Sequence, residues 1–159
     1  MNRGVTLEAG ALTLRRAGAA DHDALLALQH RAYARNRTLL GVEPLPLCVD
    51  YHVVLAEKEV WLADSKGGLA GALVLEPRDG DLLIESIATD PACQAQGHGR
   101  ALLAAAEARG RSLGYRAVRL YTGSKLTHLI DWYARHGFTI ERVEALSDRS
   151  ITHMIKTIF

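Results

Sequence analysis

The feature that most constrains this chain is an apolar stretch that leads through a glycine-bearing loop into a helical pattern and then a second β-type stretch. Residues 82–89 predict a buried strand, residues 99–113 place apolar side chains at helical spacing, and residues 116–122 alternate as a strand does. Two strands joined by a helical crossover lie parallel in one sheet. The chain therefore has to contain a β-α-β unit.

The flanking segments predict more strands and helices. Strand patterns occupy residues 11–17, 60–64, 69–76, 138–143 and 151–158. Helical patterns occupy residues 21–37, 50–57 and 126–135, the first beginning at Asp21 as its N-cap. We predict an α/β fold with a mixed, mostly antiparallel sheet of about six to seven strands, one parallel pair and helices on both faces. At 159 residues the chain fits one domain, 1–159, and residues 1–10 look like a flexible arm.

Charge and cysteine content narrow the classes of function. Lys and Arg number 19 against 18 Asp and Glu, without a basic cluster, so we expect no nucleic-acid partner. Cys48 and Cys93 lack the spacing of metal ligands, and reduced thiols are expected. The N-terminus has no apolar run typical of a signal peptide, and no window approaches the roughly 20 apolar residues of a membrane span. We expect a cytoplasmic protein without a membrane partner.

The loop in the β-α-β unit spells Gln-x-x-Gly-x-Gly over residues 94–99. A dinucleotide fingerprint would need glycine at Leu102, and the Gly-Lys-Ser/Thr of a P-loop does not occur in the sequence. Glycines let the backbone approach a phosphate, and a helix N-terminus binds anions. Arg100 places a cation at the start of the helix, which suits an external anion better than it suits the helix dipole. The loop predicts a pyrophosphate site, although a plain helix-capping turn would also fit Gly-x-Gly alone.

A second motif, Tyr-Ala-Arg-His-Gly-Phe at residues 133–138, follows downstream. With the loop, it makes residues 82–138 resemble the core of the GCN5-related N-acetyltransferase (GNAT) family. The resemblance implies acetyl-CoA as cosubstrate, no metal, and a strand that splays from its neighbour at a bulge to open a V-shaped cleft. The pantetheine arm would bond to the main chain of Ile87, Ala88 and Thr89. The pyrophosphate would bind the backbone of Ala95, Gln96, Gly97, His98, Gly99 and Arg100.

Transfer of an acyl group from a thioester to an amine needs a base, oxyanion donors and an acid for the thiolate. Tyr133 holds the position where this family places an acid, and a phenol with a pKa of about 10 is protonated at neutral pH; the alternative is an aromatic side chain that packs at a helix end. Glu85 interrupts an apolar strand, where burial would raise the pKa of a carboxyl toward that of a base. A Glu85 that faces solvent or pairs with an arginine is equally open, as is a water chain as the base. The Ile87 N–H is the expected oxyanion donor.

Other residues limit the analogy. His128, His136 and His153 lack metal-ligand spacing and are expected to pack or face solvent, and the backbone of His98 is expected to matter more than its imidazole. Many relatives carry asparagine where this chain has Leu126 and Leu129.

The leading hypothesis is an N-acetyltransferase that moves acetyl from acetyl-CoA to a primary amine by direct attack in a ternary complex, with a small molecule as acceptor. A protein acetyltransferase, acting on an N-terminus or a lysine, stays open. So does a catalytically silent acyl-CoA-binding sensor or structural module. The resemblance is also consistent with a homodimer through the terminal strands.

Overall fold

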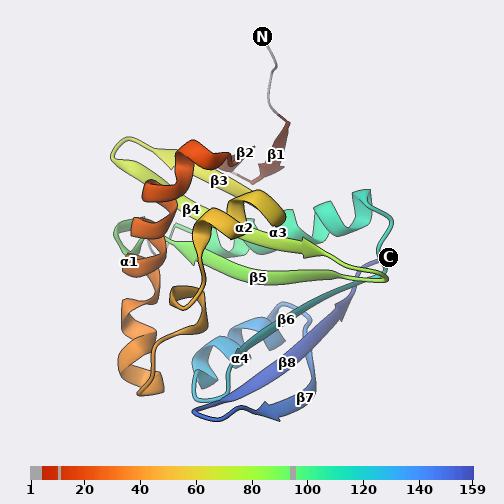
Figure 1. Ribbon diagram of the computed structural model, residues 1–159. Helices are drawn as coiled ribbons and strands as arrows, with labels where there is room; N and C mark the ends of the chain where they lie inside the picture. The colour runs from red at the N-terminus through yellow and green to blue at the C-terminus, as the bar shows by residue number, and fades with distance from the viewer. Residues whose placement is uncertain (1–4, 11, 94–95) are drawn as a thin grey trace.

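The computed structural model describes residues 5–10, 12–93 and 96–159 (Figure 1). Its strands are β1 (Thr6–Ala9), β2 (Leu12–Arg16), β3 (Glu59–Ser65), β4 (Gly68–Pro77), β5 (Leu82–Thr89), β6 (Ala117–Gly123), β7 (Thr139–Ala145) and β8 (Ser150–Thr157). Its α-helices are α1 (His22–Leu40), α2 (Tyr51–Glu57), α3 (His98–Ser112) and α4 (Thr127–Arg135).

The strands form one eight-stranded sheet in the order β1-β2-β3-β4-β5-β6-β8-β7. Strands β5 and β6 run parallel, as the crossover through α3 requires, and the other neighbouring pairs are antiparallel. The predicted fold class is confirmed. The sheet has one strand more than expected, because residues 6–9 form β1 instead of part of a flexible arm. Leu7 and Ala9 of β1 pack on the core cluster that contains α3, which explains why this short segment is ordered as a strand.

Two hydrophobic cores lie on opposite faces of the sheet. Helices α1 and α2 cover one face, where Leu25, Leu28 and Val54 are buried. Helix α3 covers the other face with its buried Leu102 and Ala106, and α4 packs at the edge of the same core (Figure 1). The helices therefore flank the sheet on both sides, and the parallel pair β5–β6 lies between the two layers.

The first helix has the predicted N-cap residue but continues beyond its predicted C-terminal end. Asp21 occupies the N-cap position, but its carboxylate accepts hydrogen bonds from Arg15 at 2.9 Å and from the Gly18 N–H at 2.8 Å instead of capping α1. At the other end α1 continues to Leu40 and stops at Gly41, whose φ of 72° is the left-handed conformation of a helix C-cap. In the described part of the chain, the model contains no helix with the length and apolar character needed to cross a membrane.

Candidate functional site

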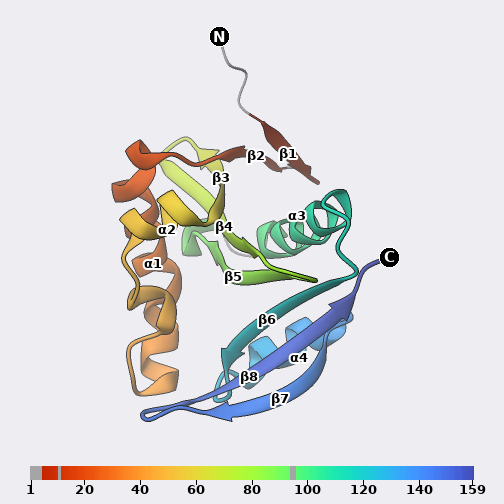
Figure 2. The same cartoon turned by 45° about the vertical axis from the view of Figure 1, so that its right-hand side comes forward.

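The site begins where β5 and β6 separate. The two strands pair only over Leu82–Ile84 and Val118–Leu120. On the other edge of β5, Ser86 pairs with Val74 and Ile84 with Leu75, so Glu85 is the extra residue of a β-bulge. Figure 2 shows β5 and β6 close together at their N-terminal ends and apart at their C-terminal ends. The splay at a bulge that the resemblance implied is present, and it starts at Glu85.

A cleft of about 790 Å³ occupies the space between the separated strands. Eight of the predicted site residues line it: Glu85, Ile87, Thr89, Gly97, His98, Gly99, Arg100 and Tyr133. Two others do not. The Ala88 side chain is buried in the core beneath α1, and Gln96 is exposed in the turn before α3. Ala95 lies outside the described residues. The fold therefore brings the candidate acid, the candidate base and the start of α3 to one cleft.

The start of α3 presents backbone donors to this cleft. Gly97 is the N-cap, with a φ of 75°, and the Ala101 N–H makes the first helical bond to the Gly97 carbonyl at 3.0 Å. The N–H groups of residues 98–100 come before that bond and have no acceptor within the helix. A side chain added to Gly97 would meet no atom of the described residues within 4 Å, so the backbone is open to that extent on this side. These are the features that an anion needs to reach a helix N-terminus.

His98 adds a polar atom to the same wall. Its Nδ1 is buried and has no hydrogen-bond partner in the described residues. A buried ring nitrogen without a partner is costly, so the site has one unused hydrogen-bonding position beside the helix start. An acyl-CoA would meet suitable groups here: open glycine backbone, free N–H groups and the Arg100 cation. The residues present fit that ligand.

Glu85 is held by a lysine rather than by an arginine or by solvent. Its Oε1 lies 2.9 Å from Lys58 Nζ, and the same nitrogen lies 3.0 Å from Glu76 Oε1 of β4. Burial raises the pKa of the Glu85 carboxyl, and the opposing effect of Lys58 is too small to cancel that shift. The hydrogen bond from Lys58 lowers the pKa of Glu76 instead. Of the two carboxyls, Glu85 is thus the one whose pKa moves toward neutrality.

Tyr133 lies in the last turn of α4. Its ring packs edge-on against Phe138 with 5.8 Å between ring centroids, and Gly137, two residues beyond the end of the helix, has a φ of 95°. Burial raises the pKa of the Tyr133 phenol, so it stays protonated at neutral pH. The hydroxyl makes no hydrogen bond to another described residue, although the side chain lines the cleft. It can act as a proton donor to a ligand in that cleft.

Tyr33 is a site residue that the sequence patterns did not indicate. From α1 its hydroxyl donates to the Ile87 carbonyl at 3.0 Å and lies 2.9 Å from Ser86 Oγ. Gln29, one helical turn earlier, also bonds to Ser86 and is fully buried. Burial raises the pKa of Tyr33 to about 12. Polar residues at this spacing on the buried stripe of α1 are the signal that could have indicated a contact to the sheet.

The remaining predicted positions are placed as follows. Leu126 is buried at the start of α4, and Leu129 lines the cleft where many relatives carry asparagine. His128 and His136 also line the cleft, and His136 Nδ1 lies 2.7 Å from the Trp132 carbonyl oxygen. Within the residues described, no three His, Cys, Asp or Glu side chains come close enough together to hold a metal ion.

A mixed sheet that splits at a bulge and receives a helix N-terminus in the cleft defines the class of acyl-CoA N-acyltransferases. A family model described as "Acetyltransferase (GNAT) domain" matches residues 56–140, which is more than half of the chain. The chain belongs to the GNAT family of acetyltransferases. Its fold supports acetyl transfer in general. No curated protein matches the sequence.

Solved structures agree with this assignment. PaiA N-acetyltransferase from Thermoplasma acidophilum, in complex with coenzyme A, is 16% identical with a TM-score of 0.73, covering 91% of this chain and 97% of that one. YncA from Salmonella typhimurium, with its cofactor acetyl-CoA, is 20% identical with a TM-score of 0.68, covering 94% and 95%. Nourseothricin acetyltransferase is 25% identical with a TM-score of 0.59, covering 65% of this chain and 66% of that one.

Proposed function

We propose that this protein transfers an acetyl group from acetyl-CoA to the primary amine of a small molecule, by direct attack in a ternary complex. One observation carries the proposal: Glu85, Tyr133 and the start of α3 line a single cleft of about 790 Å³ between separated strands. The three are far apart in the sequence, and each supplies a different requirement of acyl transfer. The CoA-bound and acetyl-CoA-bound relatives support the choice of cosubstrate.

Acetyl-CoA would be held mainly by backbone. Beyond Ile84 the edge of β5 has no β6 partner, so the main-chain groups of residues 87–89 that face this edge, other than the Ile87 carbonyl bound by Tyr33, are available to a pantetheine arm. Its pyrophosphate would rest on the N–H groups at the start of α3, with Arg100 as a cation beside them. Bound there, acetyl-CoA supplies an activated acetyl group as a thioester.

Glu85 is the proposed base. An amine with a pKa of about 10 arrives largely protonated, so it must lose a proton before it can attack. A carboxyl with a raised pKa accepts that proton more readily than an ordinary glutamate. The neighbouring Lys58 stabilises the ionised form of Glu85, which is the form that accepts the proton. The proposed proton route runs from the amine to Glu85 and then to solvent.

Tyr133 is the proposed acid. Its phenol is protonated at neutral pH because burial raises its pKa, and its hydroxyl is free to donate to the departing sulfur. The Ile87 N–H is the proposed donor to the acetyl oxygen as negative charge develops there. Tyr33, bonded to the Ile87 carbonyl, would hold that peptide in position.

The test separates binding from chemistry. Calorimetric titration with acetyl-CoA, and with CoA for comparison, should give micromolar binding, and thiol release should follow when a suitable amine is added. Tyr133→Phe should lower kcat by roughly 10²-fold or more while acetyl-CoA affinity changes by less than about twofold. Tyr115→Phe, a partly buried tyrosine that does not line the cleft, is the matched control.

Equal losses of turnover and affinity in Tyr133→Phe would contradict the acid role. Tight acetyl-CoA binding without thiol release across a broad panel of amines would instead identify an acyl-CoA-binding sensor. Absence of binding would mean that the loop before α3 is only a helix-capping turn.

A further inference from the structure

A second cavity, of about 280 Å³, opens beside the main cleft on the face covered by α1 and α2. The two cavities share five wall residues, so they meet where β5 and β6 separate and along the segment between α1 and α2: Leu45, Pro46, Glu85, Ser86 and Tyr121. The bulge causes this arrangement. Glu85 contacts Lys58 beside α2, and Ser86 contacts α1, so two consecutive side chains are turned to the same face of the sheet.

The lining of this side pocket is apolar except at its mouth. Leu45, Val49, Val54 and Val74 are four of its ten lining residues, and Glu85 is the one charged side chain among the described residues that line it. None of these lining residues is Lys, Arg or His. A carboxylate or phosphate group would find no positive partner among these lining residues, whereas a cationic amine would find at the entrance the Glu76–Lys58–Glu85 cluster, which carries one excess negative charge.

The segment of residues 41–50, between α1 and α2, lines one side of the pocket through Leu45, Pro46, Cys48 and Val49. Tyr51 donates to the Pro46 carbonyl at 2.6 Å from the α2 end of this segment. From the β7–β8 turn, Arg149 donates to the Glu43 carbonyl at 2.6 Å.

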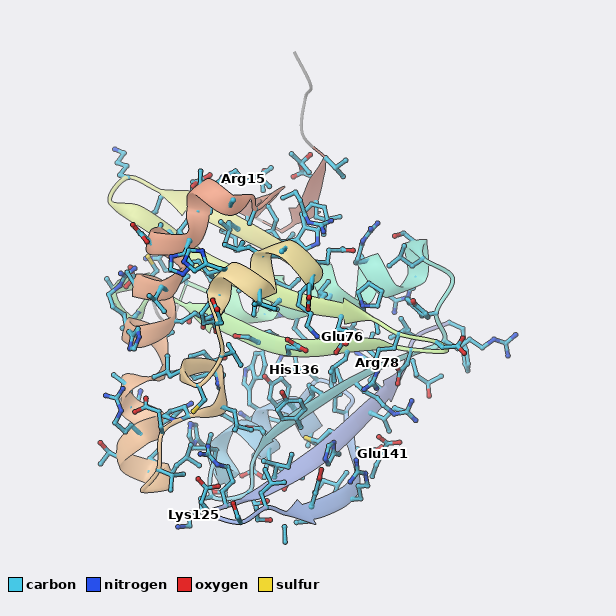
Figure 3. All side chains as sticks on the ribbon, viewed as in Figure 1. Arg15, Glu76, Arg78, Lys125, His136 and Glu141 are labelled. Carbon is cyan, nitrogen blue, oxygen red and sulfur yellow. The ribbon has the colours of Figure 1, made fainter. Side chains whose placement is uncertain are left out.

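The C-terminal end of α1 is held by a hydrogen bond from the residues just before α4. Lys125 donates to the Leu40 carbonyl at 3.4 Å, and Figure 3 shows Lys125 at the lower end of α1. The segment is thus attached to the structures on either side of the split sheet.

The volume limits the size of the occupant. At about 30 Å³ for each water-sized group, a cavity of about 280 Å³ has room for about nine non-hydrogen atoms. That is below the range of about 300–1,000 Å³ typical of pockets for drug-sized ligands.

We infer that the acceptor is a compact primary amine on an apolar body, such as an arylalkylamine, bound in this side pocket with its nitrogen at Glu85. The inference rests on the proposed function. The reaction breaks the carbon–sulfur bond of the thioester and forms a carbon–nitrogen bond. The ammonium form of the acceptor gives up two protons, one through Glu85 to solvent and one to the departing sulfur, which leaves the amide and the thiol of CoA.

The first test is a matched set of amines with acetyl-CoA, followed by thiol release. The set is 2-phenylethylamine, phenylalanine, spermidine and a lysine-containing peptide. The kcat/KM for 2-phenylethylamine should exceed that for phenylalanine at least about tenfold, because the carboxylate of phenylalanine would lie beside the Glu76–Lys58–Glu85 cluster, which carries one excess negative charge. A preference for the amino acid, the polyamine or the peptide would overturn the inference and leave acetyl transfer itself intact.

The second test measures binding of 2-phenylethylamine by calorimetry in the presence of saturating CoA, which does not depend on turnover. Val54→Phe fills the pocket from α2, and Val53→Phe is its matched control, because Val53 is the adjacent exposed residue and does not line the pocket. Val49→Phe changes a 47% exposed residue of the 41–50 segment. It fills the pocket with less risk to folding.

Binding should weaken at least about tenfold in Val54→Phe and Val49→Phe, and remain within about twofold of the original in Val53→Phe. Affinity for CoA should not change in any of the three variants. Absence of binding to the unsubstituted protein, or equal binding by all variants, would overturn the inference. If the binding pattern holds but no amine in the set releases thiol, the pocket inference stands and the proposed acetyl transfer is wrong.

Discussion

Replacement of Lys58 by methionine gives the sharpest test of how the candidate base is controlled. Lys58 Nζ is shared between Glu85 at 2.9 Å and Glu76 at 3.0 Å, and the three groups form an ion cluster with one excess negative charge. Methionine keeps most of the length of the side chain and removes its charge. Since a nearby cation favours the ionised form of a carboxyl, its loss should raise the pKa of Glu85 further.

The structure sets a lower limit on that rise. Two unit charges 2.9 Å apart interact by about 1.4 kcal/mol at the dielectric constant of bulk water, which corresponds to about one pKa unit. The Lys58 and Glu85 side chains are each only 22% exposed, so the effective dielectric constant is lower than that of water and the interaction is stronger. We expect the acid limb of kcat/KM against pH to move up by about one unit or more in Lys58→Met.

The assay is thiol release with one amine across the pH range, in the original protein and in variants. A base works when deprotonated, so activity falls as pH drops through the pKa of Glu85, and a higher pKa moves that fall to higher pH. Titration of the amine itself is common to all profiles and cancels in the comparison. Lys58→Arg keeps the positive charge and should give the same acid limb of kcat/KM against pH as the original protein. Lys66→Met, at an exposed lysine of the β3–β4 turn, should also leave this limb unchanged. An unmoved limb in Lys58→Met, or one moved to lower pH, would refute the assignment of Glu85 as base.

Two further predictions concern stability and cosubstrate binding. Asp81→Asn should lower the free energy of unfolding by about 2 kcal/mol in urea titrations, because Asp81 is buried and binds Arg78 at 2.7 Å and also Arg119. The hydrogen bond from Arg78 lowers the pKa of Asp81, so the original protein should lose this stability as pH falls through the folded-state pKa. If the free energy of unfolding of Asp81→Asn fell with pH in the same way, the loss in the original protein would not come from Asp81. Gly97→Ala should weaken acetyl-CoA binding about tenfold in calorimetry, since φ is 75° there and a Cβ strains the loop. Gly114→Ala, with a φ of 81° beyond the other end of α3, should leave that affinity unchanged, and equal losses in both would point to general destabilisation.

Local patterns were enough to predict most of the fold. Strand β5 begins and ends at the predicted residues, because a largely apolar run, interrupted at Glu85 and Ser86, lies between the 78–81 turn and Pro91. Strand β1 was missed, since four residues with a single buried side chain become a strand only through pairing with β2. The extension of α1 to Leu40 depends on a left-handed glycine that the sequence pattern did not mark.

The candidate site was predictable only where its residues carry local signals. The loop before α3 and the tyrosine of α4 stand in recognisable motifs, and the cleft contains both. The partners of Glu85 and Ile87 could not be found in this way. Lys58 and Tyr33 come from segments 27 and 54 residues away, and their contacts exist only once α1 and α2 lie on the sheet. The side pocket likewise arises from the bulge, and a glutamate at position 85 does not by itself predict a bulge.

Strands β5 and β6 are joined along only three residue pairs, and this bears on how the molecule resists unfolding. Past Ile84 no ladder of backbone hydrogen bonds joins β5 to β6. Strands β6, β7 and β8 are therefore attached to the rest of the protein largely through side-chain packing and the contacts at the end of α1. A molecule that touches both walls of the cleft is bound only while the two halves are assembled. At 100 times its dissociation constant such a ligand adds about 2.7 kcal/mol to the free energy of unfolding. The free energy of unfolding of this protein would then increase with the concentration of its own cosubstrate.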